Sequence, residues 1–257
     1  MRIISLNAWL GFAYDKLEPF LMKQSESVDM FCFQEVLMEP RTATPDAVKV
    51  MEKHGGKAPV YDLYQRIQKA LPDFSGVPST EYIDNGGRLA IFFRKGISLA
   101  GYGESKVLDA ITNENLLGTG ATMSQSVRLQ WAKLPNGLLV ANTHGAFIWG
   151  IYGDCLERAA QSRRWLALLE RLHGKKLLVG DLNLKPELEG TRILEAKMRN
   201  LVKENNVTTT RSLLSAKDPH GLINDYVFTS PDLYVKKFEV LPDVVSDHLP
   251  LLIEVDC

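Results

Sequence analysis

The amino-acid sequence predicts a layered domain of the α/β or α+β class, and three observations support this prediction. Short apolar runs of strand length recur along the whole chain, a few stretches between them have helical spacing, and no shift in composition marks a linker. A length of 257 residues with 45% hydrophobic residues allows a sizeable core without disulfides or metal. We therefore treat residues 1–257 as a single domain.

Nine apolar runs are the predicted strands. Residues 127–134 alternate between apolar and polar, as a half-buried strand does, whereas 138–143 and 176–181 are continuously apolar, as central strands are. The segment 135–137, with sequence PNG, predicts a hairpin turn between two of the runs. The full set is 2–6, 29–33, 89–93, 127–134, 138–143, 176–181, 225–230, 233–241 and 249–255.

Helices are expected at three places, with a fourth candidate at 61–71. The segment 154–172 has apolar residues near helical spacing, and so has 191–205. The segment 16–25 follows Asp15, which is a suitable N-cap. The proline-rich segment 37–87 is interpreted as long surface loops around the fourth helix.

Composition and charge restrict the class of protein. The formal net charge is −1, so no overall basic field attracts nucleic acid or an anionic membrane. The three cysteines are far apart and have no metal-binding or redox spacing, which indicates a reducing compartment. Neither a signal peptide nor an apolar stretch of membrane-spanning length is evident. We expect a cytoplasmic monomer that does not insert into membranes.

Polar groups stand at the ends of six of the predicted strands. If the strands pack into one sheet, these groups meet in a single cleft, where each needs a hydrogen-bond partner or a metal. Taken alone, Ser246 and Asp247 are also common turn residues, and Asp225 and Asn183 allow the same interpretation. The groups are Asn7, Gln34–Glu35, Thr143–His144, Asp181 with Asn183, Asn224–Asp225 and Asp247–His248.

The residue types in this set favour one kind of chemistry. Four carboxylates and two amide oxygens are hard ligands that suit Mg²⁺ or Mn²⁺ rather than structural zinc. Two histidines are available for acid–base work. A hard cation, carboxylates and imidazoles together are typical of phosphoester hydrolysis by metal-assisted attack of water. The chain has no G-x-S-x-G elbow and no catalytic-cysteine signature for a covalent nucleophile.

Six short motifs, in the order SLNAW, FQEV, NTHG, GDLN, NDYVF and SDHLP, carry a family resemblance that extends from residue 2 to residue 255. In them the chain resembles the endonuclease/exonuclease/phosphatase superfamily of DNase I-like phosphoesterases. The resemblance implies a four-layer α/β sandwich, in which two mostly antiparallel β-sheets pack face to face with helices outside.

The resemblance also implies a metal site. Glu35 corresponds to the principal metal ligand, Asn7 lies beside it, and Asp247 completes the ligand set. The implied ion is Mg²⁺ or Mn²⁺. Some members carry an acid two residues after the first asparagine, where this chain has Trp9, so a second metal-binding mode is in doubt.

The remaining motif residues are implied to act on the phosphoester. His248 corresponds to the general base or phosphate-stabilising histidine, and Asp225 to the carboxylate that orients it. Asp181 and Asn183 correspond to the pair that positions the attacking water and a phosphate oxygen. His144 corresponds to a histidine that contacts the phosphate or helps to protonate the leaving group.

The leading hypothesis is a Mg²⁺-dependent hydrolase of phosphoester substrates, with a phosphodiesterase or nuclease as first choice. A phosphatase of small phosphorylated molecules or lipid headgroups, and a catalytically inactive binding module, are the alternatives. Nucleic acid is an open candidate partner: aromatic residues at Tyr61, Tyr64, Phe74 and Tyr82 either stack on bases or anchor loops. Three arginines, Arg88, Arg128 and Arg211, are expected in surface salt bridges rather than on phosphate.

Overall fold

A computed structural model describes residues 1–38, 58–80, 87–109, 126–148, 151, 153–215 and 221–256. Its strands are β1 (Arg2–Asn7), β2 (Met30–Val36), β3 (Phe74–Pro78), β4 (Arg88–Arg94), β5 (Gly101–Leu108), β6 (Val127–Lys133), β7 (Leu138–His144), β8 (Lys175–Asp181), β9 (Arg199–Asn200), β10 (Asp225–Thr229), β11 (Val235–Val240) and β12 (Leu251–Val255). Its helices are η1 (Trp9–Gly11), α1 (Tyr14–Gln24), α3 (Leu63–Ala70), α4 (Leu156–Arg171), α5 (Glu189–Glu195) and α6 (Leu201–Glu204).

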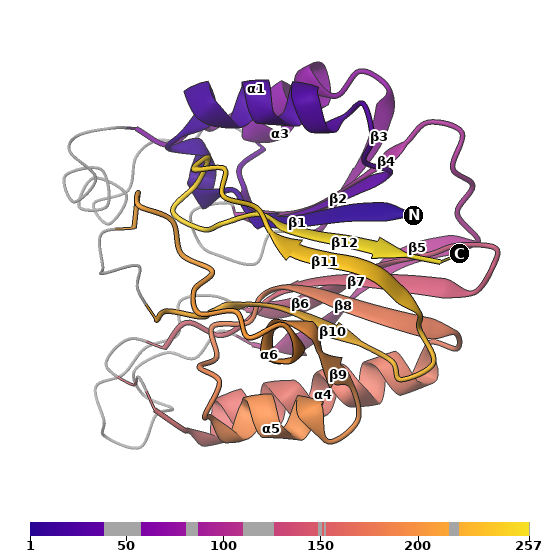
Figure 1. The fold of residues 1–257 in the computed structure, drawn as a ribbon, viewed down its shortest axis with the longest axis vertical. Coiled ribbons are helices and arrows are strands. Elements are labelled where there is room, and N and C mark those ends of the chain that lie inside the picture. Colours follow the sequence, from indigo (N-terminus) through magenta and orange to yellow (C-terminus); the bar gives the residue numbers. More distant parts are fainter. Residues whose placement is uncertain are drawn as a thin grey trace.

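The strands form two six-stranded sheets that lie face to face between helices (Figure 1). The first sheet has the order β11-β12-β1-β2-β4-β3 and the second β5-β6-β7-β8-β10-β9. Helices α1 and α3 cover the outer face of the first sheet, and α4 and α5 cover the outer face of the second. The predicted four-layer sandwich is therefore confirmed.

Most neighbouring strands are antiparallel, but each sheet contains one parallel pair at its centre. β1 is parallel to β2, and β7 is parallel to β8. Parallel neighbours end at the same edge of a sheet, so Asn7 and Gln34 are direct partners in one pair, and His144 and Asp181 in the other. This arrangement brings the polar strand ends of the sequence together.

Three apolar clusters hold the layers together. One joins the first sheet to α1 and α3, one joins the second sheet to α4 and α5, and the third fills the space between the sheets. The alternation of side chains along each strand divides residues between clusters: Phe31 and Phe33 of β2 face the helices, while Met30 and Cys32 face the other sheet. Cys32 is fully buried there and packs as a small apolar side chain.

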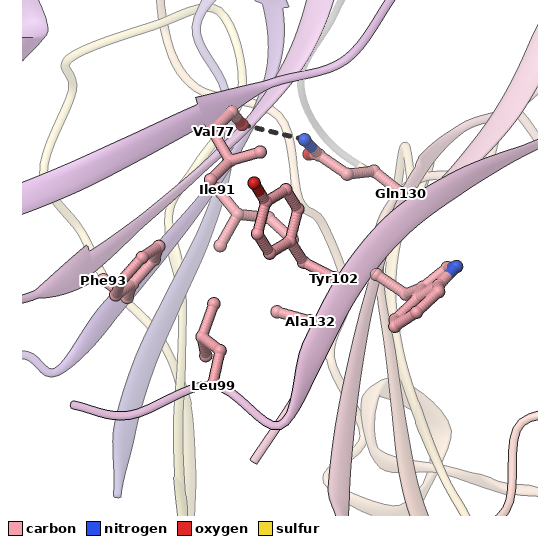
Figure 2. A pocket seen from close by; sticks show the side chains of 8 residues that line it. Val77, Ile91, Phe93, Leu99, Tyr102, Gln130 and Ala132 are labelled. Atoms are coloured by element: carbon pink, nitrogen blue, oxygen red, sulfur yellow. Dashed lines mark hydrogen bonds between the residues drawn. The ribbon is translucent and has the colours of Figure 1, made fainter.

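A polar link also joins the two sheets. The Gln34 amide donates to Asn142 Oδ1 at 2.7 Å, and Asn142 Nδ2 donates to the Phe33 carbonyl at 2.9 Å. Gln130 Nε2 donates to the Val77 carbonyl at 2.8 Å, as the dashed line in Figure 2 marks. These directional bonds complement the nonspecific apolar contact and fix how the strand ends of one sheet face those of the other.

Several predicted elements differ from the observed ones. The segment 191–205 is α5, the short strand β9 and α6 rather than one helix, and Asn200 caps α6 by accepting a hydrogen bond from the Lys203 amide. Asp15 lies inside α1, whose N-cap is Ala13. Strands β3 and β5 were not predicted, because β3 contains a proline and a glycine, and β5 contains two glycines and a polar run, with Tyr102 and Lys106 exposed.

The hairpin at 135–137 and the helix near 61–71 are confirmed. No helix in the described ranges is both long and apolar enough to cross a bilayer.

Candidate active site

One row of residues crosses the second sheet at the edge where β7 and β8 end. Arg128 pairs with His144, His144 with Asp181, and Asp181 with Asp225, each directly opposite the next. All four side chains share the face that looks toward the first sheet, because they keep the alternation of inward residues such as Val179. Regular strand register alone therefore places an imidazole between an arginine and two buried carboxylates.

Two glycines let β7 and β8 approach closely beside this row. A Cβ built on Gly180, which has a φ of +140°, would lie 1.9 Å from the Thr143 carbonyl oxygen. A Cβ on Gly145 would lie 1.9 Å from the Leu182 carbonyl oxygen. Each glycine neighbours a row residue in sequence, so these close approaches help to set where His144 and Asp181 stand.

Glu35 reaches the site through an irregularity of the first sheet. Regular alternation along β2 would turn Glu35 outward with Phe31 and Phe33. A bulge between Phe33 and Val36, together with a φ of +55° at Glu35, turns the carboxylate inward instead. There it accepts a hydrogen bond from Asn7 Nδ2 at 3.1 Å. A positive φ at a glutamate is strained, and such strain concentrates at functional sites.

Asn7 connects carboxylates of the two sheets. Its amide nitrogen donates to Glu35 Oε1 and, at 3.2 Å, to Asp181 Oδ2. Its oxygen accepts the Trp9 backbone N–H at 2.9 Å. In this arrangement, assigned from the hydrogen-bond network, Asn7 positions two acids through its nitrogen. Ligation of a metal through its oxygen stays a prediction.

Asp225 holds His248 from one side of the ring, and Thr210 in turn holds Asp225. Its Nδ1 lies 2.8 Å from Asp225 Oδ2, which also accepts a hydrogen bond from Thr210 Oγ1 at 2.8 Å. On the other side of the ring, an Arg211 Nη atom contacts His248 Nε2. Because a guanidinium only donates, Nε2 is the acceptor and the proton of the neutral ring lies on Nδ1, facing Asp225.

The segment before β12 positions Asp247. Ser246 Oγ donates to the Asn7 carbonyl at 2.7 Å, which ties this loop to the end of β1. Arg211 forms a salt bridge with Asp247 Oδ2, and Asp247 Oδ1 lies 3.7 Å from His248 Nε2. Asp247 and His248 therefore lie at a common centre, as the sequence predicted.

His144, Asp181 and Asn183 complete the centre. The Nε2 atoms of His144 and His248 each lie 3.6 Å from Asp181 Oδ2. The Asn183 backbone N–H donates to Asp181 Oδ1 at 2.9 Å, and its side chain donates to the Gly145 carbonyl at 2.9 Å. Asn183 has a φ of +50°, and the tight turn at this residue directs its backbone N–H back toward the Asp181 carboxylate.

Burial shifts the acid–base properties of the cluster. Desolvation raises the pKa of Glu35 to about 7, against the hydrogen bond from Asn7, which lowers it. Desolvation likewise raises the pKa of Asp225 to about 7, opposed by the hydrogen bond from Thr210. Burial lowers the pKa of the His248 imidazole to about 4 and also lowers that of His144. Both histidines are therefore neutral bases near pH 7.

The donor atoms suit a divalent cation. Within the described residues, oxygen and nitrogen atoms of Asp181, Asp225 and His248 lie within 4.8 Å of one another. Glu35 and Asp247 add two further carboxylates close by, and Arg211 brings a positive charge to the four acids. Buried acids in this excess call for a compensating cation, and a set in which carboxylate oxygens predominate suits Mg²⁺ or Mn²⁺.

Seven of the eight side chains proposed from the sequence converge here, and the eighth residue, Asn183, reaches Asp181 through its backbone N–H. Sequence reasoning missed three others. Arg211 was expected in a surface salt bridge, and this was wrong: its partners are Asp247 and His248. Thr210 and Ser246, which hold Asp225 and the Asp247 loop, were also missed. The run of three threonines before Arg211 was the available signal, since hydroxyls near motif acids often orient them.

Other expectations concern residues near the cleft. Arg128 does form a salt bridge, with Glu104 at 3.3 Å. Phe74 is 1% exposed and packs on Phe31 and Arg94, so it anchors the core rather than stacking on a base. Tyr61 and Tyr64 pack against the same cluster, while Tyr82 lies outside the described residues.

A separate small apolar pocket opens between the two sheets beside β4, β5 and β6 (Figure 2). Ile91, Phe93, Leu99, Tyr102 and Ala132 line it, and it contains none of the carboxylates or histidines of the centre. It is therefore no candidate for phosphate chemistry.

Comparisons with known proteins agree with this architecture. The sequence model of the Endonuclease/Exonuclease/phosphatase family matches residues 4–248. A search of curated proteins found no match.

Solved structures share the fold at low sequence identity. A mannosyl-6-phosphatase from Bacteroides thetaiotaomicron is similar with a TM-score of 0.73 and 16% identity, over 100% of both chains. The human Nocturnin catalytic domain with a bound sulfate anion has a TM-score of 0.62 and 17% identity, over 100% of this chain and 93% of that one. Truncated Caenorhabditis elegans TDP2 has a TM-score of 0.61 and 15% identity, over 100% of this chain and 97% of that one.

Proposed function

Because this chain belongs to the endonuclease/exonuclease/phosphatase family, we propose that it is a hydrolase that cleaves phosphoesters with Mg²⁺ or Mn²⁺. The observation that carries this proposal is the Asp225–His248 pair, whose neutral imidazole lies 3.6 Å from Asp181 among an excess of buried acids. An oriented base beside a cation-binding cluster is what metal-assisted attack of water requires.

The proposed roles follow from the geometry of each group. Glu35 and Asp247, with Asn7 beside them, would hold the ion, which supplies charge neutralisation on the phosphate. His248 Nε2 accepts a proton from the attacking water, while Asp225 holds the ring in the required tautomer and stabilises the imidazolium.

Asp181 and Asn183 orient the water or a phosphate oxygen. The Asn183 backbone N–H holds the Asp181 carboxylate, and the Gly145 carbonyl holds the Asn183 side chain. His144 lies on the other side of Asp181 from Asp225 in the sheet and would contact the phosphate or protonate the leaving oxygen.

Phosphodiester cleavage, as by a nuclease, is our first candidate for the reaction, and hydrolysis of a phosphomonoester is the second. The full-length similarity to a mannosyl-6-phosphatase favours the second candidate, as does the burial of Phe74, which removes one candidate for base stacking. We retain a cytoplasmic monomer as part of the proposal.

Hydrolysis of two model substrates tests the proposal. Bis-p-nitrophenyl phosphate is a diester and p-nitrophenyl phosphate a monoester, and each is assayed with Mg²⁺, Mn²⁺ or EDTA. We expect cleavage that EDTA abolishes and that His248→Ala lowers by about 10² to 10⁴. His173→Ala is the matched control, since His173 is exposed at the end of α4.

The preferred substrate then decides between the two candidates. A preference for the diester would lead to DNA and RNA substrates, and a preference for the monoester to sugar and headgroup phosphates. Binding of Mn²⁺ without turnover of either substrate would support the inactive binding module, and equal turnover in EDTA would contradict the metal-dependent mechanism.

A further inference from the structure

Arg211 is the cationic side chain of the centre, and the segment around it is rigidly held. The Thr210 carbonyl accepts the Leu249 N–H at 2.8 Å, and the Ser212 N–H donates to the Asp247 carbonyl at 3.0 Å. An isolated bridge pairs Arg211 with His248. The backbone of residues 210–212 is therefore fixed against the loop that carries Asp247 and His248.

The Arg211 guanidinium lies where the proposed reaction needs other groups. It contacts His248 Nε2, the atom that has to accept a proton from water. It also contacts the Asp247 carboxylate, which is a proposed ligand of the ion. Its third contact is weak, with Ser215 Oγ at 3.4 Å. Water at His248 and an ion at Asp247 would therefore each displace one of its two strong contacts.

The anionic oxygens of a phosphate are the partner that a displaced Arg211 guanidinium would bind most strongly. The Arg211 side chain is only 14% exposed, so its planar fork stays inside the centre. Of the other acids of the centre, Glu35 is a proposed ligand of the ion and Asp225 already contacts His248, whereas the phosphate would bring new anionic oxygens to the guanidinium. Guanidinium groups match such oxygens with two parallel hydrogen bonds.

We propose that Arg211 binds the non-bridging oxygens of the phosphate that is hydrolysed, and that it occupies His248 and Asp247 only while substrate and ion are absent. This inference rests on the proposed function. In the resting state the guanidinium compensates the charge of Asp247 and donates to His248 Nε2. In the occupied state it moves, by side-chain rotation alone, to the phosphate, so that it determines substrate affinity rather than metal affinity.

Two titrations by calorimetry test this inference on wild type, Arg211→Gln and Arg211→Lys. The first is Mn²⁺ into the apo protein. The second is inorganic phosphate into the protein loaded with Mg²⁺. Arg163→Gln is the matched control, because Arg163 forms an exposed salt bridge with Glu189 on the helical layer.

We expect Arg211→Gln to weaken phosphate binding by about tenfold to hundredfold, as loss of a charged hydrogen-bond donor does. Mn²⁺ should bind as tightly as in wild type or more tightly, since Asp247 loses a competing cation. Arg211→Lys should keep part of the phosphate affinity, because it preserves the charge without the fork. In the assay of model substrates, KM should rise more than kcat falls.

Other outcomes overturn the inference. Phosphate affinity within twofold of wild type in Arg211→Gln would mean that the guanidinium does not bind phosphate. Parallel loss of Mn²⁺ and phosphate binding would mean that Arg211 only supports the structure. A wild-type protein that binds neither ligand would instead refute the proposed function, so the two failures are distinguishable.

Discussion

The two sheets contribute to the centre in different ways. The second sheet supplies His144, Asp181 and Asp225 as direct partners in one row of regular strands. The first sheet supplies Glu35 from a bulge with a positive φ, and His248 from the loop before β12. One half of the site thus follows from strand register, and the other half depends on departures from it.

The difference between the two sheets separates side chains that are held rigidly from side chains that can adjust. Side chains in a row of paired strands are fixed by many backbone hydrogen bonds. Side chains on bulges and loops depend on a few individual contacts, such as the Ser246 hydroxyl on the Asn7 carbonyl. The groups proposed to bind the ion and to change partners, Glu35, Asp247 and Arg211, belong to this second half.

The hydrogen bond between Asp225 and His248 joins the two halves of the site, and catalytic rate should be most sensitive to its loss. In Asp225→Asn, the new amide nitrogen would donate to His248 Nδ1 and force the ring proton onto Nε2, so the base could no longer accept a proton. We expect kcat to fall by about 10³ to 10⁴, measured on whichever model substrate is cleaved. Asp62→Asn, in an exposed pair with Arg66, is the control. A loss below tenfold would show that Asp225 does not set the tautomer.

The close approach of β7 and β8 should be the most sensitive feature for stability. In Gly180→Ala the new methyl would lie 1.9 Å from the Thr143 carbonyl at a φ of +140°, so a strand must shift. We expect the free energy of unfolding to fall by about 3 kcal/mol or more, measured by urea denaturation. Gly137→Ala has a φ of +90° but open space around it, and should lose about 1 kcal/mol. Equal losses in both would mean that φ alone matters.

The same contrast explains how far the sequence could predict the molecule. The row of the second sheet was predictable, because continuous apolar strands ending in His144 and Asp181 place both groups at one edge. Glu35 was identified from its motif, although alternation along β2 would have pointed it the wrong way. Arg211 was not identified, because its role depends on long-range pairing with the 246–249 loop, which no local pattern records.

The prediction of secondary structure from the sequence failed at three places for a related reason. β3 and β5 are edge strands of the two sheets, with little apolar surface of their own. Tertiary pairing with β4 and β6 makes them strands. In 191–205, the helical pattern is interrupted where Arg199 and Asn200 pair with β10.

A smaller effect on kcat is expected from the Thr210 hydroxyl, which holds Asp225 in its contact with His248. Thr210→Val keeps the shape of the side chain but removes the 2.8 Å hydrogen bond to the Asp225 carboxylate, together with the acceptor of the Asn224 and Asp225 backbone N–H groups. We expect kcat to fall by about tenfold, because second partners of catalytic carboxylates typically contribute about 10- to 100-fold. Thr209→Val, one residue away, loses hydroxyl bonds to the Leu222 carbonyl and the Arg211 backbone and should change kcat less. The opposite ranking would place the ordering role on Thr209.

The smallest expected effect is on the pH dependence of stability, and it distinguishes Glu35 of the first sheet from Asp225 of the second. Burial raises the folded-state pKa of Glu35 and of Asp225 to about 7, above their values in the unfolded chain. Groups shifted in this direction stabilise the fold below the unfolded pKa, and that contribution is lost as pH rises through about 7. The lowered pKa values of the buried His248 and His144 oppose this loss up to about pH 6.5, because the unfolded imidazoles bind protons that the folded ones do not. The apo protein should therefore lose about 1 kcal/mol of unfolding free energy between about pH 6.5 and pH 8.

Denaturation at several pH values, with EDTA or with Mg²⁺, measures this effect. Mg²⁺ should reduce the loss, because it binds the ionised acids, and Glu35→Gln should reduce it without metal. If Glu35→Gln leaves the whole slope in place, the titrating acid is Asp225, in the ordered row of the second sheet. The irregular half of the site would then be the half that is already ionised and ready for metal at neutral pH.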